Sequence, residues 1–359
     1  MNILPRYIAR EFLRLFAMTI TAFVGIYLVM DFFENMGAIV KAGAPAESAI
    51  RYFALRLPFV LYQGIPAGIL LSTLIALGMM RRYNEITAMK GAGIDPLRQS
   101  RVLFHIALVL GVFMFLLNEW IVPSSNRAAE LVWRVEIKKE KPPPSFRRSG
   151  IWFREERRFY RIDLFSPDDG HLKGITIFAL SEGFTPEEIV TAKKAEWSGS
   201  QWILEDVTLR TFKDGQLNNY QESSSFPIHL PYTLEDFRKT KKKPEEMNIL
   251  ELYSYIKRLE RFGSSSRAWR PDLHFKISFP FVTLIMVLVG LPFSLMGSGR
   301  GGLALTVGVA FAVGFSYWIV LAFSLSLGRS GTSPAWLSAW IPNILFTTIG
   351  AALLSRVKR

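Results

Sequence analysis

Three apolar spans, a long polar stretch and three more apolar spans follow one another along this chain, and this order limits its possible folds. The apolar spans cover residues 12–31, 53–80, 102–122, 277–296, 303–323 and 335–354. A bilayer core about 30 Å thick needs about 20 apolar residues per helix, so each span can cross a membrane. A soluble fold would have to bury six helices that are apolar all round. The pattern therefore predicts a six-helix membrane protein with one large soluble domain.

Lysine and arginine residues in the short segments predict which side of the membrane each segment faces. They are concentrated in 1–14, 81–101 and 356–359, and they are sparser in 31–52 and 324–334. Because basic loops remain in the cytoplasm, we expect both termini to be cytoplasmic and the soluble domain to be outside. The net charge of +13 comes largely from these flanks, so it does not indicate nucleic-acid binding.

The polar middle of the chain predicts a β-rich domain. Runs rich in aromatic and β-branched residues, bounded by turn-forming residues, are typical of an antiparallel sandwich or an open barrel. These runs cover residues 151–165, 174–181, 187–198, 201–212 and 216–230. A helix with an apolar stripe at Leu252, Ile256 and Leu259 should then return the chain to the membrane. The expected domains are 1–122, 123–270 and 271–359.

No catalytic or metal-binding constellation stands out in the sequence. The chain has no cysteine, which excludes disulfides and thiolate zinc sites, and its four histidines are not paired at metal-ligand spacing. His105 lies in the third span, where we expect a packed or interhelical polar group. Residues 297–302 match G-x-G-x-x-G, but they join two apolar spans and follow no strand, so a tight turn is the better interpretation. A Walker A sequence is absent, so any ATP hydrolysis must come from a partner.

Two basic segments beside the membrane have predictable local structure. Arg6, Arg10 and Arg14 recur every four residues, which predicts a short surface helix that leads into the first span. Residues 81–96 are polar and helix-compatible until Gly91, and Gly93 and Pro96 follow as helix-ending residues. A short helix there could dock a cytosolic partner, or the segment could be an ordinary solvated loop.

Ionisable and polar residues gather near the outer ends of the spans, where burial is costly. They are Asp31, Glu34, Arg51, Arg56, Asn118 and Glu119. These side chains could reach the interface, or they could line a polar route for an amphiphile. Lys41, Arg127 and Arg134 lie near the same level and could meet the phosphates of an anionic lipid or remain solvated surface charges.

Four segments, in order, carry a resemblance to a known family. They are RRYNEITAMKGAGID (81–95), NEWIVP (118–123), GIWFREERRFYRID with GITIFAL (150–163 and 174–180), and LHFKISFPFVTLIMVLVGLPFSL (273–295). Together they resemble the LptF/LptG (YjgP/YjgQ) family of lipopolysaccharide export permeases, with the opening strands most like LptG. The resemblance implies an α-helical membrane protein of the bacterial inner membrane. It has six transmembrane helices (3+3) and a periplasmic β-jellyroll-like domain inserted between helices 3 and 4.

The resemblance also implies a transport mechanism and partners. Such a permease is a non-enzymatic subunit of an ABC transporter, without a cofactor of its own. It pairs with an LptF-like permease, an LptB-like ATPase dimer that binds ATP, a single-span LptC-like subunit and a periplasmic LptA-like bridge. Segment 81–96 would be the coupling helix, with Glu85 meeting an arginine of the ATPase. The implied coupling residues are Arg82, Tyr83, Glu85, Ile86, Met89 and Gly91.

The outer end of the first span departs from the family pattern. The family often has lysines there as substrate contacts, whereas this chain has Asp31 and Glu34, and only Lys41 fits the basic pattern. Arg127 and Arg134 fall where the family has basic residues after its third span. Two alternatives stay open at this point: an ABC permease for another lipid or a lipoprotein, and a membrane-anchored enzyme or sensor without a transport role.

Overall fold

The computed structural model divides the chain into two compact units. It describes residues 3–139, 145–147, 150–166, 170–181, 185–213, 216–239, 243–261, 265–296 and 302–357. The helical unit comprises Met1–Glu140, Pro244–Ile249 and Arg267–Arg359, and the β unit comprises Lys141–Lys243 and Leu250–Ser266. The turn expected at 297–302 falls almost entirely outside the described residues.

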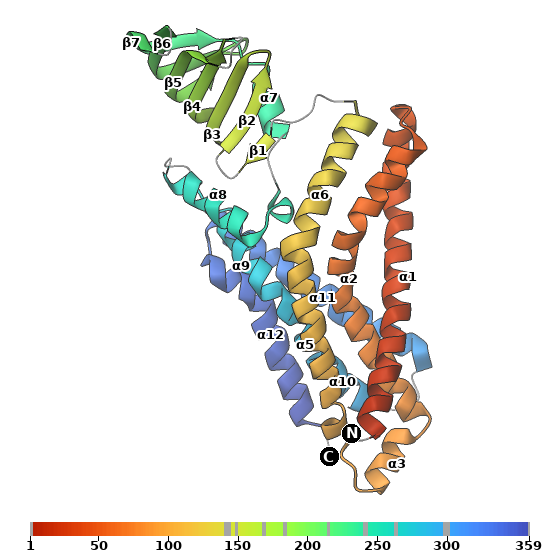
Figure 1. Ribbon diagram of the computed structural model, residues 1–359. Coiled ribbons are helices and arrows are strands. Elements are labelled where there is room, and N and C mark those ends of the chain that lie inside the picture. The colour runs from red at the N-terminus through yellow and green to blue at the C-terminus, as the bar shows by residue number, and fades with distance from the viewer. Residues whose placement is uncertain are drawn as a thin grey trace. The chain divides into compact units, whose positions relative to one another are not determined.

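Apolar helices long enough to cross a membrane dominate the helical unit, and the described residues contain six of them (Figure 1). The first half consists of α1 (Ile3–Lys41), α2 (Ala46–Arg82), α3 (Glu85–Gly91), α4 (Pro96–Gln99), α5 (Arg101–Leu116), the π-helical turn η1 (Leu117–Ile121), α6 (Val122–Leu131) and a second π-helical turn, η2 (Val132–Ile137). The second half consists of η3 (Pro244–Glu246), α9 (Arg270–Ser278), η4 (Phe279–Phe281), α10 (Val282–Met296), α11 (Gly302–Ser330) and α12 (Ala335–Ser355). The predicted membrane protein with three-plus-three helices is confirmed.

Several helices run further than the apolar pattern predicted. The helix expected around Arg6, Arg10 and Arg14 is not a separate element, because α1 is continuous from Ile3 and carries these exposed arginines on its first turns. Helix α2 passes through both Pro58 and Pro66 without interruption. Membrane helices tolerate such prolines where neighbouring groups satisfy the freed carbonyls.

Helices α2 and α10 lie at the centre of the bundle, and α1 lies at its edge. Most residues of the apolar stretches of α2 and of α9–α10 are buried, whereas few of those of α1 are. Close crossings depend on small residues, as is usual between membrane helices. At Gly111 on α5, for example, an added Cβ would come within 2.7 Å of the Thr283 hydroxyl on α10. His105 is exposed on α5 and bonds its own helix at the Arg101 carbonyl, so the expected packed position is wrong.

A buried ion pair fastens α1 to α2. Asp31 is 7% exposed, and its Oδ1 lies 3.8 Å from Nη2 of Arg56. The Asn35 amide donates to Asp31 at 3.1 Å, and Arg56 donates to the Tyr27 hydroxyl at 3.2 Å. These two charges therefore pair across helices, and Asp31 does not reach out to the interface. Of the two acidic residues near this end of α1, Glu34 is the exposed one.

Replacing Asp31 with asparagine should loosen α1. The variant keeps the side-chain volume but leaves Arg56 without a counter-ion among apolar helices. We expect a loss of about 1–2 kcal/mol of stability, below the value for a fully buried pair because Arg56 is partly exposed. Thermal unfolding in detergent measures this loss. The exposed Glu34→Gln change is the matched control, and equal melting temperatures for the two variants would contradict the role of the pair.

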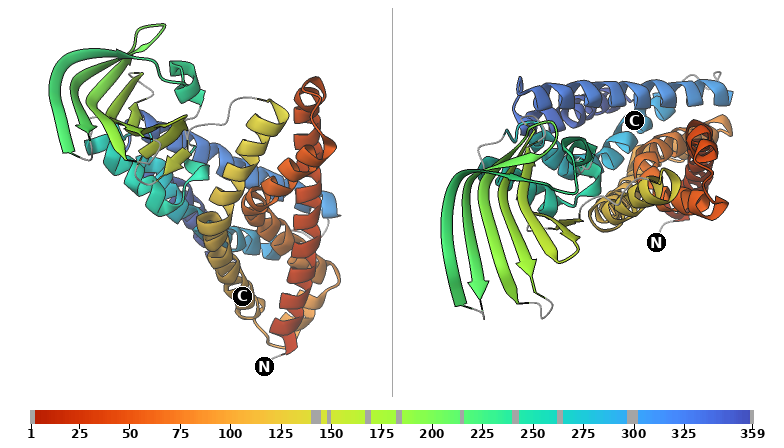
Figure 2. Two further views of the ribbon diagram at one scale, coloured as in Figure 1. Left: turned by 45° about the horizontal axis from the view of Figure 1, so that its top comes forward. Right: turned by 90° about the horizontal axis from the view of Figure 1, so that it is seen from above.

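The β unit is a single antiparallel sheet with its strands in sequence order. Its strands are β1 (Ser145–Arg147), β2 (Gly150–Glu155), β3 (Arg158–Ser166), β4 (His171–Leu180), β5 (Pro186–Trp197), β6 (Trp202–Lys213) and β7 (Gln216–Ile228). The predicted β domain is confirmed, and Figure 2 shows that the sheet is strongly curved. The described strands form a meander without Greek-key crossovers.

One predicted strand is a hairpin. The run 151–165 was expected as one strand, but β2 and β3 pair with each other around Glu156, which has a left-handed φ of 49°. Two exposed glutamates and two exposed arginines in a row break the hydrophobic alternation there, and the chain reverses. The boundaries of the other predicted strands agree with β4 to β7 within a few residues.

Aromatic residues fill the concave core of the β unit. Helix α7 (Leu234–Lys239) places Phe237, which is fully buried, against Phe153, Phe165 and Trp202. The Trp202 indole donates to the Tyr232 carbonyl at 2.9 Å, so its polar atom is satisfied. Helix α8 (Ile249–Arg261) buries the predicted stripe of Leu252, Ile256 and Leu259. Desolvation by burial lowers the pKa of Arg258 on the same helix.

Candidate functional site

The segment between α2 and α5 folds as the sequence predicted. Asn84 adopts a left-handed conformation with φ of 59° and separates α2 from α3. Gly93, at φ of 73°, ends the turn after α3, a conformation that favours glycine. Asp95 then caps α4 by accepting a hydrogen bond from the Leu97 amide at 2.9 Å. The result is a short, well-bounded helix between the second and third membrane helices.

The two faces of α3 have different surroundings. Ile86 and Met89 are buried in the same cluster as Ile8 and Phe12 of α1, so they anchor α3 to the bundle. Gly91 at the end of α3 is exposed, and so are Arg82 and Tyr83, which precede α3. Among the coupling residues that the resemblance implies, Ile86 and Met89 therefore anchor the helix, while Arg82, Tyr83 and Gly91 are accessible.

Glu85 bridges α3 and the first turns of α1. Its carboxylate accepts a hydrogen bond from the Tyr7 hydroxyl at 3.1 Å, across 78 residues of sequence. Arg81, four residues before Glu85, donates to the Ser294 carbonyl of α10 at 3.3 Å. Glu85 is thus held by a phenol, which is a neutral hydrogen-bond donor.

The three basic residues suggested as lipid contacts gather at the other end of the helical unit. An apolar cluster that includes Ile39, Tyr52 and Ala129 joins the end of α1, the start of α2 and α6. Lys41 is the exposed last residue of α1. Arg134 is bound to Glu130 at 2.6 Å one turn earlier in the helix, so its guanidinium is already engaged.

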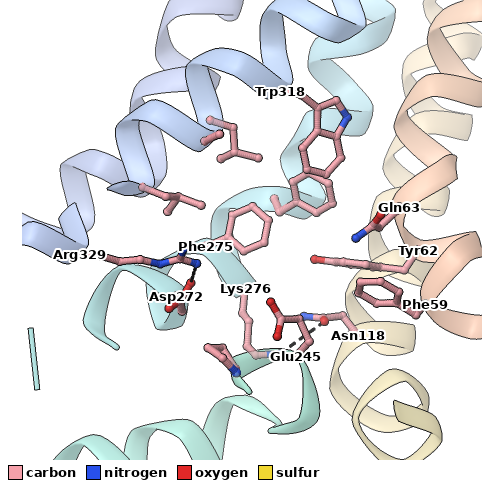
Figure 3. Close-up of a pocket in the computed structure, with 15 residues that line it drawn as sticks. Phe59, Tyr62, Gln63, Asn118, Glu245, Asp272, Phe275, Lys276, Trp318 and Arg329 are labelled. Atoms are coloured by element: carbon pink, nitrogen blue, oxygen red, sulfur yellow. Dashed lines mark hydrogen bonds and ion pairs between the residues drawn. The ribbon is translucent and has the colours of Figure 1, made fainter. Parts of the chain in front are cut away.

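A cavity of about 240 Å³ lies inside the helical unit, between α2, η1, α9 and α11 (Figure 3). It is lined by Phe59, Tyr62, Gln63, Asn118, Pro244, Glu245, Asp272, Phe275, Lys276, Phe279, Trp318, Leu321, Ala322, Leu325 and Arg329. At one side Asp272, 6% exposed, accepts from Arg329 at 2.6 Å and ties α9 to α11. Deeper in, the Lys276 ammonium lies 3.5 Å from Oδ1 of Asn118.

The polar residues of this cavity were missed at the sequence level, apart from Asn118. Asp272 and Lys276 lie one helical turn apart just before the fourth apolar run, and Arg329 lies just after the fifth. Charged residues at such positions are typical of interfacial anchors, so their sequence positions did not indicate burial in a cavity. Their burial is the informative property, because ionisable groups inside membrane bundles mark functional positions by default.

The fold and these sites define a class: a multi-pass membrane protein with a β domain inserted between its third and fourth membrane helices. The sequence profile of the lipopolysaccharide export system permeases LptF and LptG matches residues 6–356, and the chain belongs to this family. It is also 26% identical, over 99% of both chains, to the lipopolysaccharide export system permease protein LptG of Haemophilus influenzae. The family expected from the four sequence segments is confirmed.

Proposed function

We propose that this chain is the LptG-like permease subunit of an ABC transporter that extracts lipopolysaccharide from the inner membrane. It passes this lipid to a periplasmic bridge of β domains. The observation that carries the proposal is the family match across residues 6–356, which includes both membrane halves and the inserted β unit. The subunit has no ATPase site of its own, and its partner binds the ATP.

The proposed orientation places both termini and α3 in the cytoplasm and the β unit in the periplasm. The distribution of lysine and arginine among the short loops supports it. In this orientation α3 faces a cytosolic LptB-like ATPase dimer. An LptF-like permease, a single-span LptC-like subunit and a periplasmic LptA-like bridge complete the assembly.

The proposed coupling surface consists of the exposed residues of α3 and of the turn that precedes it. Arg82, Tyr83 and Gly91 offer side chains and backbone to the ATPase, while Glu85 offers a carboxylate for an arginine of that partner. Ile86 and Met89 contribute by holding α3 against the bundle, since their side chains are buried there. At the opposite end, Lys41 and Arg127 are proposed contacts for lipid phosphates, and Arg134 supports them while bound to Glu130.

Reconstitution tests the transport proposal directly. The chain is purified with its LptF-like and LptB-like partners, placed in proteoliposomes with lipopolysaccharide, and assayed for ATP-driven transfer to a soluble LptA-like acceptor. Transfer that requires ATP is the expected result. Mass spectrometry of lipids that co-purify with the complex addresses the alternatives. A different lipid or a lipoprotein, without lipopolysaccharide, would indicate another ABC permease, and failure to recover any nucleotide-binding partner would indicate a sensor.

Tyr7 should act as a positioning residue for the coupling surface. The Tyr7→Phe variant keeps the ring but removes the hydroxyl that bonds Glu85. This hydrogen bond is exposed, so we expect it to contribute no more than a typical one, about 0.5–1.5 kcal/mol, and ATPase association should weaken about two- to ten-fold. Tyr253→Phe on α8 is the matched control. If Tyr7 had a merely structural role, the losses of ATPase association in Tyr7→Phe and Glu85→Ala would add in the double variant. If Tyr7 positions Glu85, the double variant should bind the ATPase no more weakly than Glu85→Ala alone.

A further inference from the structure

The cavity between α2, η1, α9 and α11 has an apolar wall and a polar end (Figure 3). Its wall is formed mainly by Phe59, Phe275, Phe279, Trp318, Leu321 and Leu325. At the polar end, Tyr62 comes from α2, Asn118 from the π-helical turn η1, and Lys276 from α9. Turns of π-helix inside longer helices are frequent at functional sites.

Two buried polar atoms at this end have no protein partner among the described residues. They are the Tyr62 hydroxyl and Nδ2 of Asn118, on side chains that are 5% and 3% exposed. Figure 3 shows the Tyr62 hydroxyl pointing into the cavity. An unsatisfied buried donor costs about 1–3 kcal/mol, so two of them at one cavity indicate that a ligand supplies an acceptor.

The charges around the cavity argue against a phosphate as this acceptor. Lys276 and Arg329 are balanced by Glu245 and Asp272, and the Asp272 carboxylate is bonded to Arg329 at 2.6 Å. A neutral oxygen suits a set of donors whose surroundings carry no net charge. The carbonyl of an ester or amide is such an oxygen, and it carries two acceptor lone pairs.

The size and position of the cavity define the rest of the ligand. At about 240 Å³ it is smaller than the usual range of drug-sized pockets, about 300–1,000 Å³, so it holds one chain and not a whole multi-chain lipid. Its lining includes Trp318, 39% exposed, and the exposed Ala322 on α11, so the cavity opens on a surface of the membrane-spanning bundle. A ligand that arrives there comes from the bilayer.

We propose that this cavity binds a single fatty acyl chain, whose ester or amide carbonyl accepts hydrogen bonds from Tyr62 and Asn118. The aromatic wall holds the methylene chain, and Lys276 fixes the amide of Asn118 through its Oδ1. Both phospholipids and the lipid A part of lipopolysaccharide carry such chains. Where the acyl chain belongs to lipid A, the inference rests on the proposed function. One acyl chain of the transported lipid then binds within a single permease subunit.

Photo-crosslinking of the assembled complex tests the proposal with two probes. One is phosphatidylethanolamine with a diazirine on one acyl chain, and the other is lipid A labelled in the same way, each in vesicles of unlabelled phospholipid. The expected result is labelling of peptides that contain 59–63 or 318–325 by at least one probe. Labelling by lipid A alone indicates that the cavity binds the transported lipid. Labelling by phosphatidylethanolamine indicates that the cavity binds a lipid of the surrounding bilayer. Absence of labelling by both probes would overturn the proposal.

Matched variants separate the cavity from the rest of the helix surface. Ala322→Trp fills the mouth of the cavity, and Ala312→Trp adds the same side chain at another exposed position of α11. We expect at least a five-fold loss of labelling for the first and none for the second. Tyr62→Phe and Asn118→Ala should each reduce labelling about two- to ten-fold, as expected for one hydrogen bond. Equal labelling in the two tryptophan variants would contradict the site.

The same preparations keep this proposal distinct from the transport proposal. Labelling of the cavity by phosphatidylethanolamine in a complex that shows no ATP-driven lipopolysaccharide transfer would overturn the proposed function and support the acyl site. Transfer without labelling of the cavity would overturn the acyl site and support the proposed function. Each variant is compared only after monodisperse elution and an unchanged melting temperature show that it is folded.

Discussion

Replacing Glu85 with arginine is expected to separate this permease from its ATPase while leaving the bundle intact. The change places a positive charge where the proposed partner also presents one, so an attraction becomes a repulsion. Truncating one partner of a hydrogen-bonded interfacial charge pair costs about 2–5 kcal/mol, so charge reversal should weaken association by about 30-fold or more. Co-purification of the ATPase and ATP-driven lipopolysaccharide transfer both measure this loss.

The control for this prediction reverses a charge elsewhere. Glu47→Arg changes an exposed residue in the first turn of α2, at the far end of that helix from α3. Glu85→Ala should give an intermediate effect, because it removes the attraction without adding a repulsion. If Glu85→Arg retained full ATPase association, α3 would have no coupling role, and the transport proposal would need another contact.

Replacing Arg329 with alanine is expected to be the most destabilising single change within the helical unit among those considered. It leaves the carboxylate of Asp272, which is 6% exposed, without its partner at 2.6 Å. Breaking a buried ion pair in this way costs about 3–5 kcal/mol, and the partial exposure of Arg329 reduces our expectation to about 2–3 kcal/mol. Thermal unfolding in detergent should show the loss.

Removing both charges together distinguishes pairing from packing. The double variant Asp272→Ala with Arg329→Ala leaves no unpaired charge, so it should be more stable than Arg329→Ala alone. Arg356→Ala, at an exposed arginine just after α12, controls for the loss of one positive charge. An Arg329→Ala variant that melts like Arg356→Ala would show that the pair contributes nothing to stability.

Local pattern was sufficient for the elements whose signal lies within one short stretch. Length and hydropathy located the six membrane helices, and Gly93 with Pro96 predicted the end of α3. The hairpin at Glu156 was missed because the charged interruption is short and aromatic residues continue on both sides of it. The strand order, likewise, depends on pairings that no single stretch encodes.

Pairings between distant residues account for what sequence reasoning missed in the sites. Asp31 pairs with Arg56, and Asp272 pairs with Arg329 across 57 residues. Separations this long follow no helical or strand period, so the sequence does not identify the partners. The short helix between the second and third membrane helices was predicted, yet its division into buried and exposed residues was not. The burial of Ile86 depends on side chains of α1 that lie almost 80 residues earlier in the sequence.

The continuity of α1 has a mechanical consequence. Its 39 residues, at 1.5 Å per residue, make a rod about 58 Å long. One end of this rod shares an apolar cluster with α3, while much of its remaining length is exposed. A tilt of about 5° imposed at the α3 end would swing the opposite end by about 5 Å, from the same rod length. Because Asp31 near that end pairs with Arg56, such a displacement would also move α2.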